Sequence, residues 1–192
     1  MPMTDSEILS RIRGGAKHLF AQIVDRYKDK GMSLAVRMLK SREEAEEALQ
    51  DAFIRAYNAL ERFEETSTFG TWFYRILYNV CLTRLGKRKD EFQSVDYDDE
   101  QSYWESDNIN TTAADVAYEK KELVDVVKTI IEAMPAKYAV ILTMFYLHEM
   151  SHEEICAVTQ LPVGTVKTHL FRARALLQKR LAKNFQVEGV EV

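Results

Sequence analysis

The sequence holds few of the residues that mark other fold classes, with only seven Gly, three Pro and two Cys among 192 residues. So few Gly and Pro leave few of the turn signals that separate short strands, which favours a helical protein. The two cysteines, Cys81 and Cys156, have no CxxC spacing and no neighbouring cluster of metal ligands. This pattern predicts plain thiols in a reducing compartment and no zinc site.

Long hydrophobic runs are missing as well. No stretch approaches the roughly 18 consecutive apolar residues of a membrane span, and residues 1–13 lack the apolar run of a signal peptide. The sequence therefore predicts a cytoplasmic protein without membrane insertion. It also lacks a phosphate-binding loop, a nucleophile–base pair and a carboxylate pair in a recognisable context, so we expect no enzymatic activity, catalytic residue or cofactor.

The net charge of −4 hides an uneven distribution of charged residues. Residues 90–107 carry eight acids and no base, and the rest of the chain holds 26 Lys and Arg against 22 Asp and Glu. Residues 163–187 contain no acid at all, which indicates a local basic surface of the kind that binds nucleic acid. Its basic residues are Lys167, Arg172, Arg174, Lys179, Arg180 and Lys183.

A boundary between two blocks lies at residues 91–112. This segment is acidic and polar without a sustained 3.6-residue apolar period, which predicts a linker that like-charge repulsion extends. It separates residues 1–90 from residues 113–192, and each block is large enough for a small helical domain. The predicted fold class is all-α, with two small helical domains joined by a polar acidic linker.

In the first block, Ser41 and Glu44 have capping-box spacing, which predicts a helix to about Leu60. One face is apolar and is expected in the core. The opposite face is polar except for Ile54, and both a solvated face and a partner-binding face remain open for it. The apolar face consists of Ala45, Ala48, Leu49, Ala52, Phe53, Ala56, Tyr57 and Leu60, and the opposite face of Glu47, Gln50, Asp51, Ile54 and Asn58.

A second helix is predicted from about Thr71 to Lys87. Its core face is expected to hold Phe73, Ile76, Leu77, Val80 and Cys81. The other face mixes aromatic, amide and cationic groups, a combination that suits melted DNA because a ring stacks a base while cations hold phosphates. An amphipathic helix whose tryptophan seals a domain edge is the alternative, and the residue chemistry alone favours it. The mixed face carries Trp72, Arg75 and Asn79, with Tyr78, Leu82 and Thr83 at its edge and Lys87, Arg88 and Lys89 at its end.

The second block is expected to contain four helices. The first runs from Thr112 to Ala133, a break follows near Pro135, and the second runs from Ala139 to His148. Ser151 and Glu154 again have capping-box spacing, which predicts a short helix over residues 152–159. Gln160 and Leu161 then form a turn, and Pro162 opens a helix to about Lys183.

The last two helices have the spacing of a helix-turn-helix, although Gln160 takes the place of the usual turn glycine. Cys156 falls where the helices cross, and Val166 packs from the second helix. A basic amphipathic surface helix is the alternative, and the acid-free run after a short helix favours DNA binding over it. The inward residues are Val166, Leu170, Ala173, Leu177 and Leu181, and the outward ones are Lys167, Thr168, Phe171, Arg172, Ala175 and Lys179.

A recognition helix contacts base edges through its N-terminal turns in the major groove. Lys167 and Arg172 can donate to guanine O6 and N7, Thr168 can bond a base or a phosphate, and Phe171 can contact a thymine methyl group. The flanking His169, Arg174 and Arg180 are assigned to phosphates or solvent.

Taken together, the motifs SREEAEEALQDAFIRAYNALERF, FGTWFYRILYNVCLTRLGKRK and EEICAVTQLPVGTVKTHLFRARALLQKRL resemble a sigma factor of the extracytoplasmic-function (ECF) group in the sigma-70 family. This group has only regions 2 and 4, and the resemblance covers nearly the whole chain. It implies a factor that binds core RNA polymerase and directs promoter-specific initiation. It also implies an anti-sigma factor as a partner, often one at the membrane.

The resemblance also assigns surfaces. It implies that Glu47, Gln50, Asp51, Ile54 and Asn58 bind the β′ coiled coil of core polymerase, and that region 4 recognises the −35 element as duplex and meets the β flap. The helix matching Thr71 to Lys87, together with the loop at residues 63–68, would recognise the −10 element and capture a flipped base, with Asn79 and Thr83 at the implicated helix positions. Glu64 and Glu65 of the loop would repel DNA unless they point away. Thr83 stands where the family often has Asp or Asn. The implied −10 contacts are Phe63, Thr66, Ser67, Trp72, Arg75, Asn79, Thr83, Lys87 and Arg88, and the implied −35 contacts are Lys167, Thr168, His169, Phe171, Arg172 and Arg174.

Overall fold

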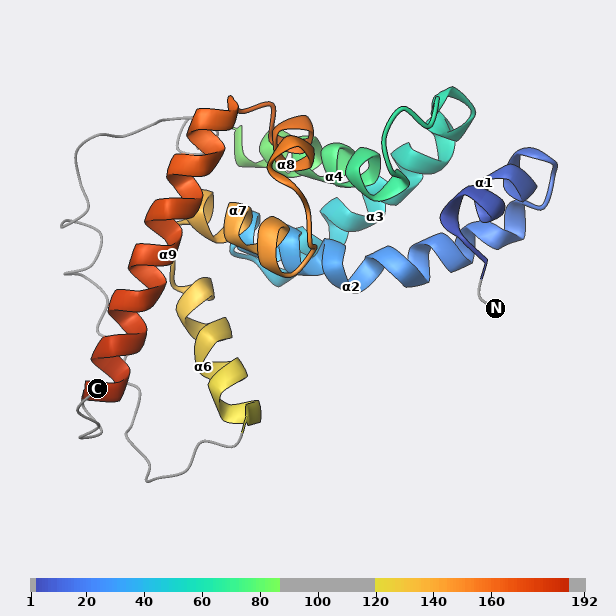
Figure 1. Ribbon diagram of the computed structural model, residues 1–192. Coiled ribbons are helices and arrows are strands. Elements are labelled where there is room, and N and C mark those ends of the chain that lie inside the picture. Colours follow the sequence, from blue (N-terminus) through green and yellow to red (C-terminus); the bar gives the residue numbers. More distant parts are fainter. Residues whose placement is uncertain (1–2, 87–119, 187–192) are drawn as a thin grey trace.

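The computed structural model describes residues 3–86 and 120–186, which form helices without a β-strand (Figure 1). The all-α expectation is confirmed. The predicted linker at 91–112 and the candidate DNA contacts Lys87 and Arg88 lie outside the described residues. The first block contains α1 (Asp5–Arg13), η1 (Lys17–Leu19), α2 (Phe20–Leu39), α3 (Arg42–Ala59), η2 (Leu60–Arg62) and α4 (Phe69–Leu85), and the second contains α6 (Lys120–Glu132), α7 (Ala136–Tyr146), α8 (His152–Thr159) and α9 (Val163–Gln186).

Local capping signals set several helix starts. The Ser41 hydroxyl accepts a hydrogen bond from the Glu44 N–H at 3.3 Å at the start of α3. At α8 the capping box of Ser151 and Glu154 is complete. Helix α4 begins two residues before the predicted Thr71, because the Thr68 side chain caps it, and it ends at Leu85 before Gly86. These bonds satisfy amide groups that a helix leaves unpaired at its start.

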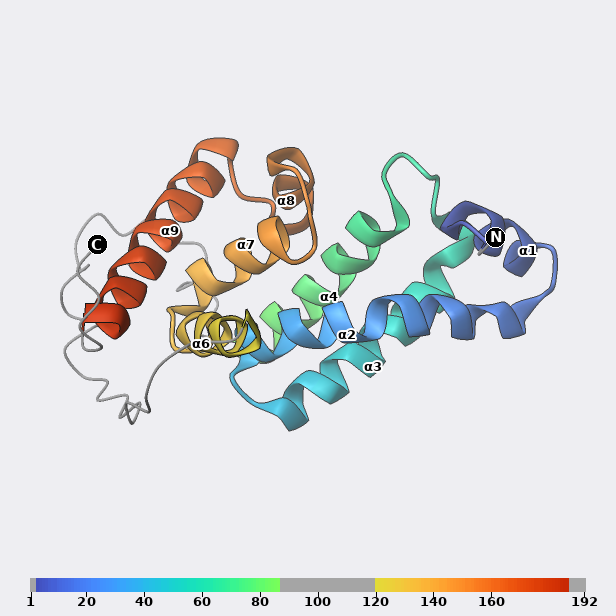
Figure 2. The ribbon, with the colours of Figure 1, turned by 60° about the horizontal axis from the view of Figure 1, so that its bottom comes forward.

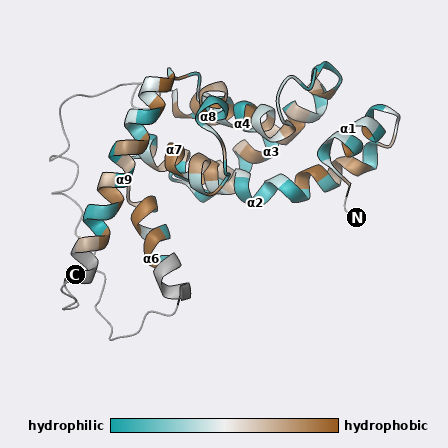
Figure 3. Ribbon diagram, viewed as in Figure 1, coloured by the Kyte–Doolittle hydropathy of each residue, from teal (hydrophilic) through white to brown (hydrophobic). Residues whose placement is uncertain are grey.

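Helices α1 and α2 precede the first element that the sequence patterns predicted. Helix α2 is the long central element, and it packs against α3, α4 and α7 (Figures 1 and 2). Brown and teal residues both occur along α2 and α9, as expected of amphipathic helices (Figure 3). Because α2 of the first block also packs against α7 of the second, it is one of the two helices that fix how the blocks sit together, the other being α4.

The predicted core faces of α3 and α4 are buried with few exceptions. The apolar period predicts Tyr57 in the core, but the residue is 37% exposed, and its ring meets that of Phe20 edge-on at 5.0 Å between centroids. Ile76 is only half-buried. The helical period predicts Tyr78 and Leu82 at the edge of the exposed face, but they are buried because α4 packs against α2, α3 and α8.

The two predicted blocks share one continuous hydrophobic core. Helix α8 packs against α4 and α7 packs against α2, as both ribbon views show (Figures 1 and 2). Val140, Met144 and Ile155 belong to the same buried cluster as the side chains of α2, α3 and α4. A smaller cluster, which includes Ile131 and Leu176, joins α6, α7 and α9. We call the α4–α8 and α2–α7 contact the junction.

Within residues 3–86 and 120–186, no helix combines the length and the apolar character needed to cross a membrane.

Gly31 allows α2 to approach α3 and α4 closely, because a Cβ atom there would lie 2.7 Å from Leu49 Cδ1 and 3.4 Å from Leu77 Cδ2. We expect Gly31→Leu to lower the free energy of unfolding by about 1–3 kcal/mol through overpacking, measured by urea denaturation. Gly164→Leu is the matched control, since it makes the same substitution in a helix where nothing lies within 4 Å of the Cβ position. Equal stability of the two variants would contradict this account of the packing.

Candidate nucleic-acid and polymerase interfaces

Helices α8 and α9 form the predicted helix-turn-helix. Gln160 ends α8 in the left-handed conformation, with φ of 60°, and its N–H donates to the Cys156 carbonyl at 2.8 Å. A non-glycine residue in this conformation costs roughly 1–2 kcal/mol, and the capping bond offsets part of that cost. Ile155 from α8 and Val166 from α9 are fully buried where the helices pack. The turn therefore forms without the usual glycine.

The N-terminal half of α9 exposes most of the predicted DNA-reading residues. Lys167 is exposed and Phe171 is 73% exposed, while Thr168 and Arg172 are half-buried. The Thr168 hydroxyl donates to the Gly164 carbonyl at 2.9 Å. Arg174 is exposed, and its guanidinium lies over the ring of Phe145 at 5.3 Å. An exposed ring beside cations can contact thymine methyl groups while the cations contact phosphates or guanine, so the chemistry of this face suits duplex DNA.

His169 is not part of this face. It is only 1% exposed and meets the Tyr138 ring edge-on, with 5.5 Å between centroids. The assignment of His169 to phosphates is therefore wrong for this structure. The helical period explains the error, because His169 follows Val166 by three residues and shares its inward face.

Helix α4 leaves a narrow strip at the surface. Arg75, Asn79 and Thr83 are exposed and follow one another at four-residue spacing, so they lie along one line. The Thr83 hydroxyl donates to the Asn79 carbonyl at 2.8 Å. We call these three residues the α4 strip. Its chemistry is polar and cationic, which suits contact with bases and phosphates.

An aromatic cluster supports one end of the α4 strip. Trp72 is half-buried, with its ring 4.8 Å from the Phe63 centroid and 5.6 Å from the Phe69 centroid. Phe63 is an implied −10 contact, but it is only 6% exposed. It therefore supports the loop from below and does not face DNA. Trp72 seals a domain edge, in agreement with the alternative interpretation, and also keeps part of its ring at the surface.

The polar face of α3 is at the surface. Glu47, Gln50, Ile54 and Asn58 are exposed, Asp51 is half-buried, and Ile54 reaches 61% exposure. We call these five residues the α3 face. Two of its acids are paired, since Asp51 accepts from Arg55 at 2.9 Å and Glu47 from Arg84 of α4 at 2.8 Å. Ile54 follows the paired Asp51 by one helical turn, so the α3 face combines an exposed apolar side chain with polar and ion-paired groups, as protein interfaces do.

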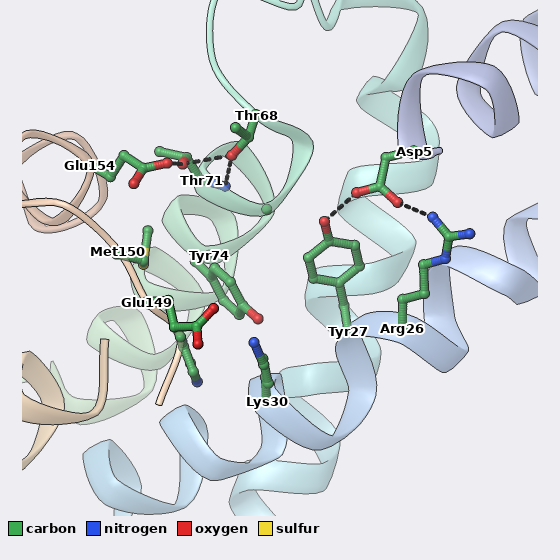
Figure 4. A pocket seen from close by; sticks show the side chains of 12 residues that line it. Asp5, Arg26, Tyr27, Lys30, Thr68, Thr71, Tyr74, Glu149, Met150 and Glu154 are labelled. Carbon is green, nitrogen blue, oxygen red and sulfur yellow. Dashed lines mark hydrogen bonds and ion pairs between the residues drawn. The ribbon is translucent and has the colours of Figure 1, made fainter. Parts of the chain in front are cut away.

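The junction contains a hydrogen-bond chain that the sequence did not predict. The Thr71 hydroxyl donates to Glu154 Oε1 at 2.9 Å, and Glu154 Oε2 accepts from the Ser151 N–H at 2.9 Å (Figure 4). The Thr71 hydroxyl also lies 2.9 Å from that of Thr68, the N-cap of α4. The Glu154 carboxylate thus lies at the N-termini of both α4 and α8, where its negative charge is favoured by the positive ends of both helix dipoles. Capping-box spacing identified Glu154, but only the fold brings it to Thr71.

A pocket of about 300 Å³ lies beside this chain at the junction, lined by residues from both blocks, including Tyr27, Lys30, Tyr74 and Glu149 (Figure 4). His148 also lines it and stacks on Tyr74, with 4.6 Å between ring centroids. Burial, together with the neighbouring Lys30 cation, lowers the pKa of His148 to about 4. The imidazole is therefore neutral at physiological pH.

The cysteines take no part in these surfaces as metal ligands. Cys81 and Cys156 are free thiols, and burial raises the pKa of Cys81 to about 12, so its reactive thiolate is suppressed. Across the described residues, no three His, Cys, Asp or Glu side chains gather closely enough to hold a metal ion.

Comparisons with known proteins agree with this geometry. Residues 23–91 match the model of sigma-70 region 2, and residues 125–177 match that of sigma-70 region 4. The chain is 34% identical over 184 residues to the ECF RNA polymerase sigma factor SigW of Bacillus subtilis (strain 168), covering 94% of this chain and 98% of the relative. It is 32% identical over 187 residues to the ECF RNA polymerase sigma-E factor of Escherichia coli (strain K12), covering 93% and 95%.

A solved structure shows the same fold. It is the sigma factor RpoE in complex with the anti-sigma factor NepR from Bartonella quintana, with a TM-score of 0.61 and 23% identity over 84% of this chain and 96% of that one. Region 2 corresponds to the block that carries the α3 face and the α4 strip, and region 4 to the block that carries the helix-turn-helix. The chain belongs to the ECF sigma factors of the sigma-70 family.

Proposed function

We propose that this sigma factor reads the −35 element with α9 and opens the −10 element with α4 and the loop before it, while the α3 face holds core polymerase. As a family member it is a non-enzymatic factor of promoter recognition and transcription initiation. The observation that carries the residue assignments is the exposure of two separate DNA-competent faces, on α9 and on α4, on helices whose other faces are buried.

At the −35 element, α9 would enter the major groove. Lys167 and Arg172 are the cations that can donate to guanine, and Phe171 offers the exposed ring that can contact a thymine methyl group. Thr168 and Arg174 lie beside them for base or phosphate contact. His169 is left out of this set because it is buried.

At the −10 element, the α4 strip and loop hydroxyls would receive an extruded base. Flipping a base costs a few kcal/mol, and a pocket that bonds the extruded base offsets that cost. Asn79 supplies amide groups, Arg75 supplies charge for phosphates, and Thr66 and Ser67 supply exposed hydroxyls. The exposed part of Trp72 offers a surface for stacking.

The α3 face is proposed as the site for the β′ coiled coil of core polymerase, and region 4 is proposed to meet the β flap. Ile54 supplies the apolar contact and the surrounding polar residues supply specificity. Tethering both DNA-reading blocks to one polymerase makes the second DNA contact effectively intramolecular, so two modest contacts act together.

The two blocks cannot stay packed at the junction while both promoter elements are bound. Elements centred near −35 and −10 lie about 25 base pairs apart, or about 85 Å at 3.4 Å per base pair. In the structure, α4 packs directly on α8, and α8 packs on α9. Packed helix axes are about 8–10 Å apart. The two blocks must therefore separate before both elements are bound.

We further propose that the protein acts in the cytoplasm and that an anti-sigma factor, in solution or at the membrane, is a partner. The Bartonella sigma factor of the same fold was solved with its anti-sigma factor. A protein that binds region 2 or region 4 would compete with core polymerase for those surfaces.

Reconstitution with bacterial core polymerase tests the proposed function. Mixed with core and a pool of random-sequence DNA, the chain is expected to select promoters that share two elements at fixed spacing, and to direct run-off transcription from them. Failure to bind core, or initiation without selected elements, would overturn the proposal.

Two substitutions should separate the DNA roles. Lys167→Ala should weaken binding to −35 duplex by about five-fold or more, since a base contact contributes about 1–3 kcal/mol. Asn79→Ala should slow strand opening, followed by permanganate reactivity of −10 thymines, and leave the −35 affinity unchanged. Lys179→Ala is the matched control, because it removes an exposed cation about 18 Å further along α9. The reverse pattern of effects would refute the assignment.

Acid should loosen the junction through His148. Above a pH of about 6.5 the imidazole is neutral in both the closed and the separated form. Below it, the separated form takes up a proton that the closed form excludes until about pH 4, so the closed form loses stability in this window. The protection factors of the α8 amides, which are the intrinsic exchange rates divided by the observed ones, should therefore fall between pH 7.5 and 5 in the wild type and fall less in His148→Phe, which keeps a ring against Tyr74. Identical pH dependence in both proteins would refute this role.

A further inference from the structure

The loop between η2 and α4 carries an electrostatic problem for a DNA-binding surface. Residues 63–68 read FEETST, so Glu64 and Glu65 stand next to the hydroxyls of Thr66 and Ser67. Residues 64–68 are all exposed. Because phosphates repel carboxylates, a loop with two free acids would resist DNA at the point where the strand must enter.

The Glu65 side chain points toward α1, and each of its carboxylate oxygens accepts a hydrogen bond from a side chain of that helix. Arg13 Nη1 donates to Glu65 Oε1 at 2.8 Å, and the Ser6 hydroxyl donates to Oε2 at 3.1 Å. The other guanidinium nitrogen, Arg13 Nη2, donates to the Phe63 carbonyl. One guanidinium therefore ties the loop to α1 at residue 63 and again at residue 65, in the forked geometry that arginine provides.

The backbone of Glu65 depends on these contacts. Its φ is 55°, in the left-handed region that non-glycine residues adopt only when their surroundings impose it. Phe63 on one side of Glu65 is anchored in the aromatic cluster, and Thr68 on the other caps α4. The loop is held at three points, which leaves Thr66 and Ser67 at its exposed tip.

Helix α1 is a firm support for this contact. Ile8, Leu9 and Ile12 are buried, and Asp5 accepts from Arg26 of α2 at 2.6 Å and from the Tyr27 hydroxyl (Figure 4). Both ribbon views place α1 beside the loop (Figures 1 and 2). Helix α1 also lies before residues 23–91, the part of the chain that matches region 2.

We infer that Arg13, assisted by Ser6, is a positioning residue for strand opening at the −10 element, an inference that rests on the proposed function of the loop. Arg13 neutralises Glu65, withdraws it from the path of the DNA, and fixes the loop so that Thr66 and Ser67 meet the extruded base. Glu64 stays at the surface, so the loop admits a base at its tip and repels phosphates on one side of it.

If Arg13 served only to stabilise the fold, Arg13→Ala would lower the melting temperature, and slower strand opening would follow from that loss of stability. The pair of Arg13 with Glu65 is partly exposed, with 33% and 39% of the two side chains accessible. Ion pairs this exposed add little to stability, so Arg13→Ala should fold with a nearly unchanged melting temperature. The effect should appear in strand opening, after core and the −35 element are bound.

The experiment uses holoenzyme assembled from the full chain and a promoter that the wild-type holoenzyme has selected. Arg13→Ala should slow opening by roughly five-fold, the scale of one partly exposed charged contact, measured by permanganate reactivity of −10 thymines. Affinities for core and for −35 duplex should not change. Adding Glu65→Gln to Arg13→Ala should restore part of the rate, because the double variant no longer presents an unpaired carboxylate to DNA.

Lys28→Ala is the matched control, since it removes a cation from an exposed pair with Asp25 on α2. Normal opening in Lys28→Ala together with slow opening in Arg13→Ala supports the inference. Equal opening by these two variants overturns it, and so does a double variant as slow as Arg13→Ala alone. A wild-type chain that selects no promoter overturns the proposed function as well, whereas selection by the wild type with normal opening by Arg13→Ala overturns only the role of Arg13.

Discussion

The packing of α4 against α2, α3 and α8 is the constraint on which the other features depend. Because three helices cover α4, its exposed residues are confined to the line through Arg75, Asn79 and Thr83 and to Arg84 near its end. The same confinement anchors the aromatic cluster beneath the loop and brings the N-terminus of α4 to that of α8. The DNA-competent strip, the supported loop and the junction are thus three results of one packing arrangement.

Charge is organised around helix ends and around neutralised acids. Glu154 serves two helix N-termini at once, and Glu65 is paired by Arg13 beside the loop. The acid-free start of α9 stays at the surface, where its cations can meet phosphates. The chain is acidic overall, yet it presents positive or neutral groups on its two DNA-competent faces. Net charge is therefore a poor guide to function in this protein.

The junction stabilises one arrangement of the two blocks with contacts of different kinds. Apolar side chains of α7 and α8 continue the core of the first block, and neutral His148 stacks on Tyr74. The Thr71–Glu154 hydrogen bond fixes the orientation of α8 relative to α4. The hydrogen bond and the ring stack each contribute little by themselves, so most of the stability of the junction comes from the shared apolar surface. The separation proposed for promoter binding would expose this apolar surface, and contacts with polymerase and promoter would have to offset that cost.

Much of the site could be predicted because it depends on local patterns. Capping residues located the starts of α3 and α8, and the helical period placed Ile54, Lys167 and Phe171 outward. Errors arose where the outcome depends on a distant neighbour. Tyr78 and Leu82 are covered by helices of other segments, and Phe63 is held by rings from α4. His169 is the exception, since the period alone could have placed it inside.

The sequence by itself determined the helical class, the helix-turn-helix, the outward faces of α3 and α9 and the resemblance to ECF sigma factors. These features depend on the spacing of residues along the chain, so capping signals and helical periodicity are enough to predict them. Only the tertiary structure decided that the two blocks share a core, that Thr71 meets Glu154, and that Arg13 reaches Glu65 from 52 residues away. Contacts between remote segments depend on how whole helices pack, and no local pattern encodes them.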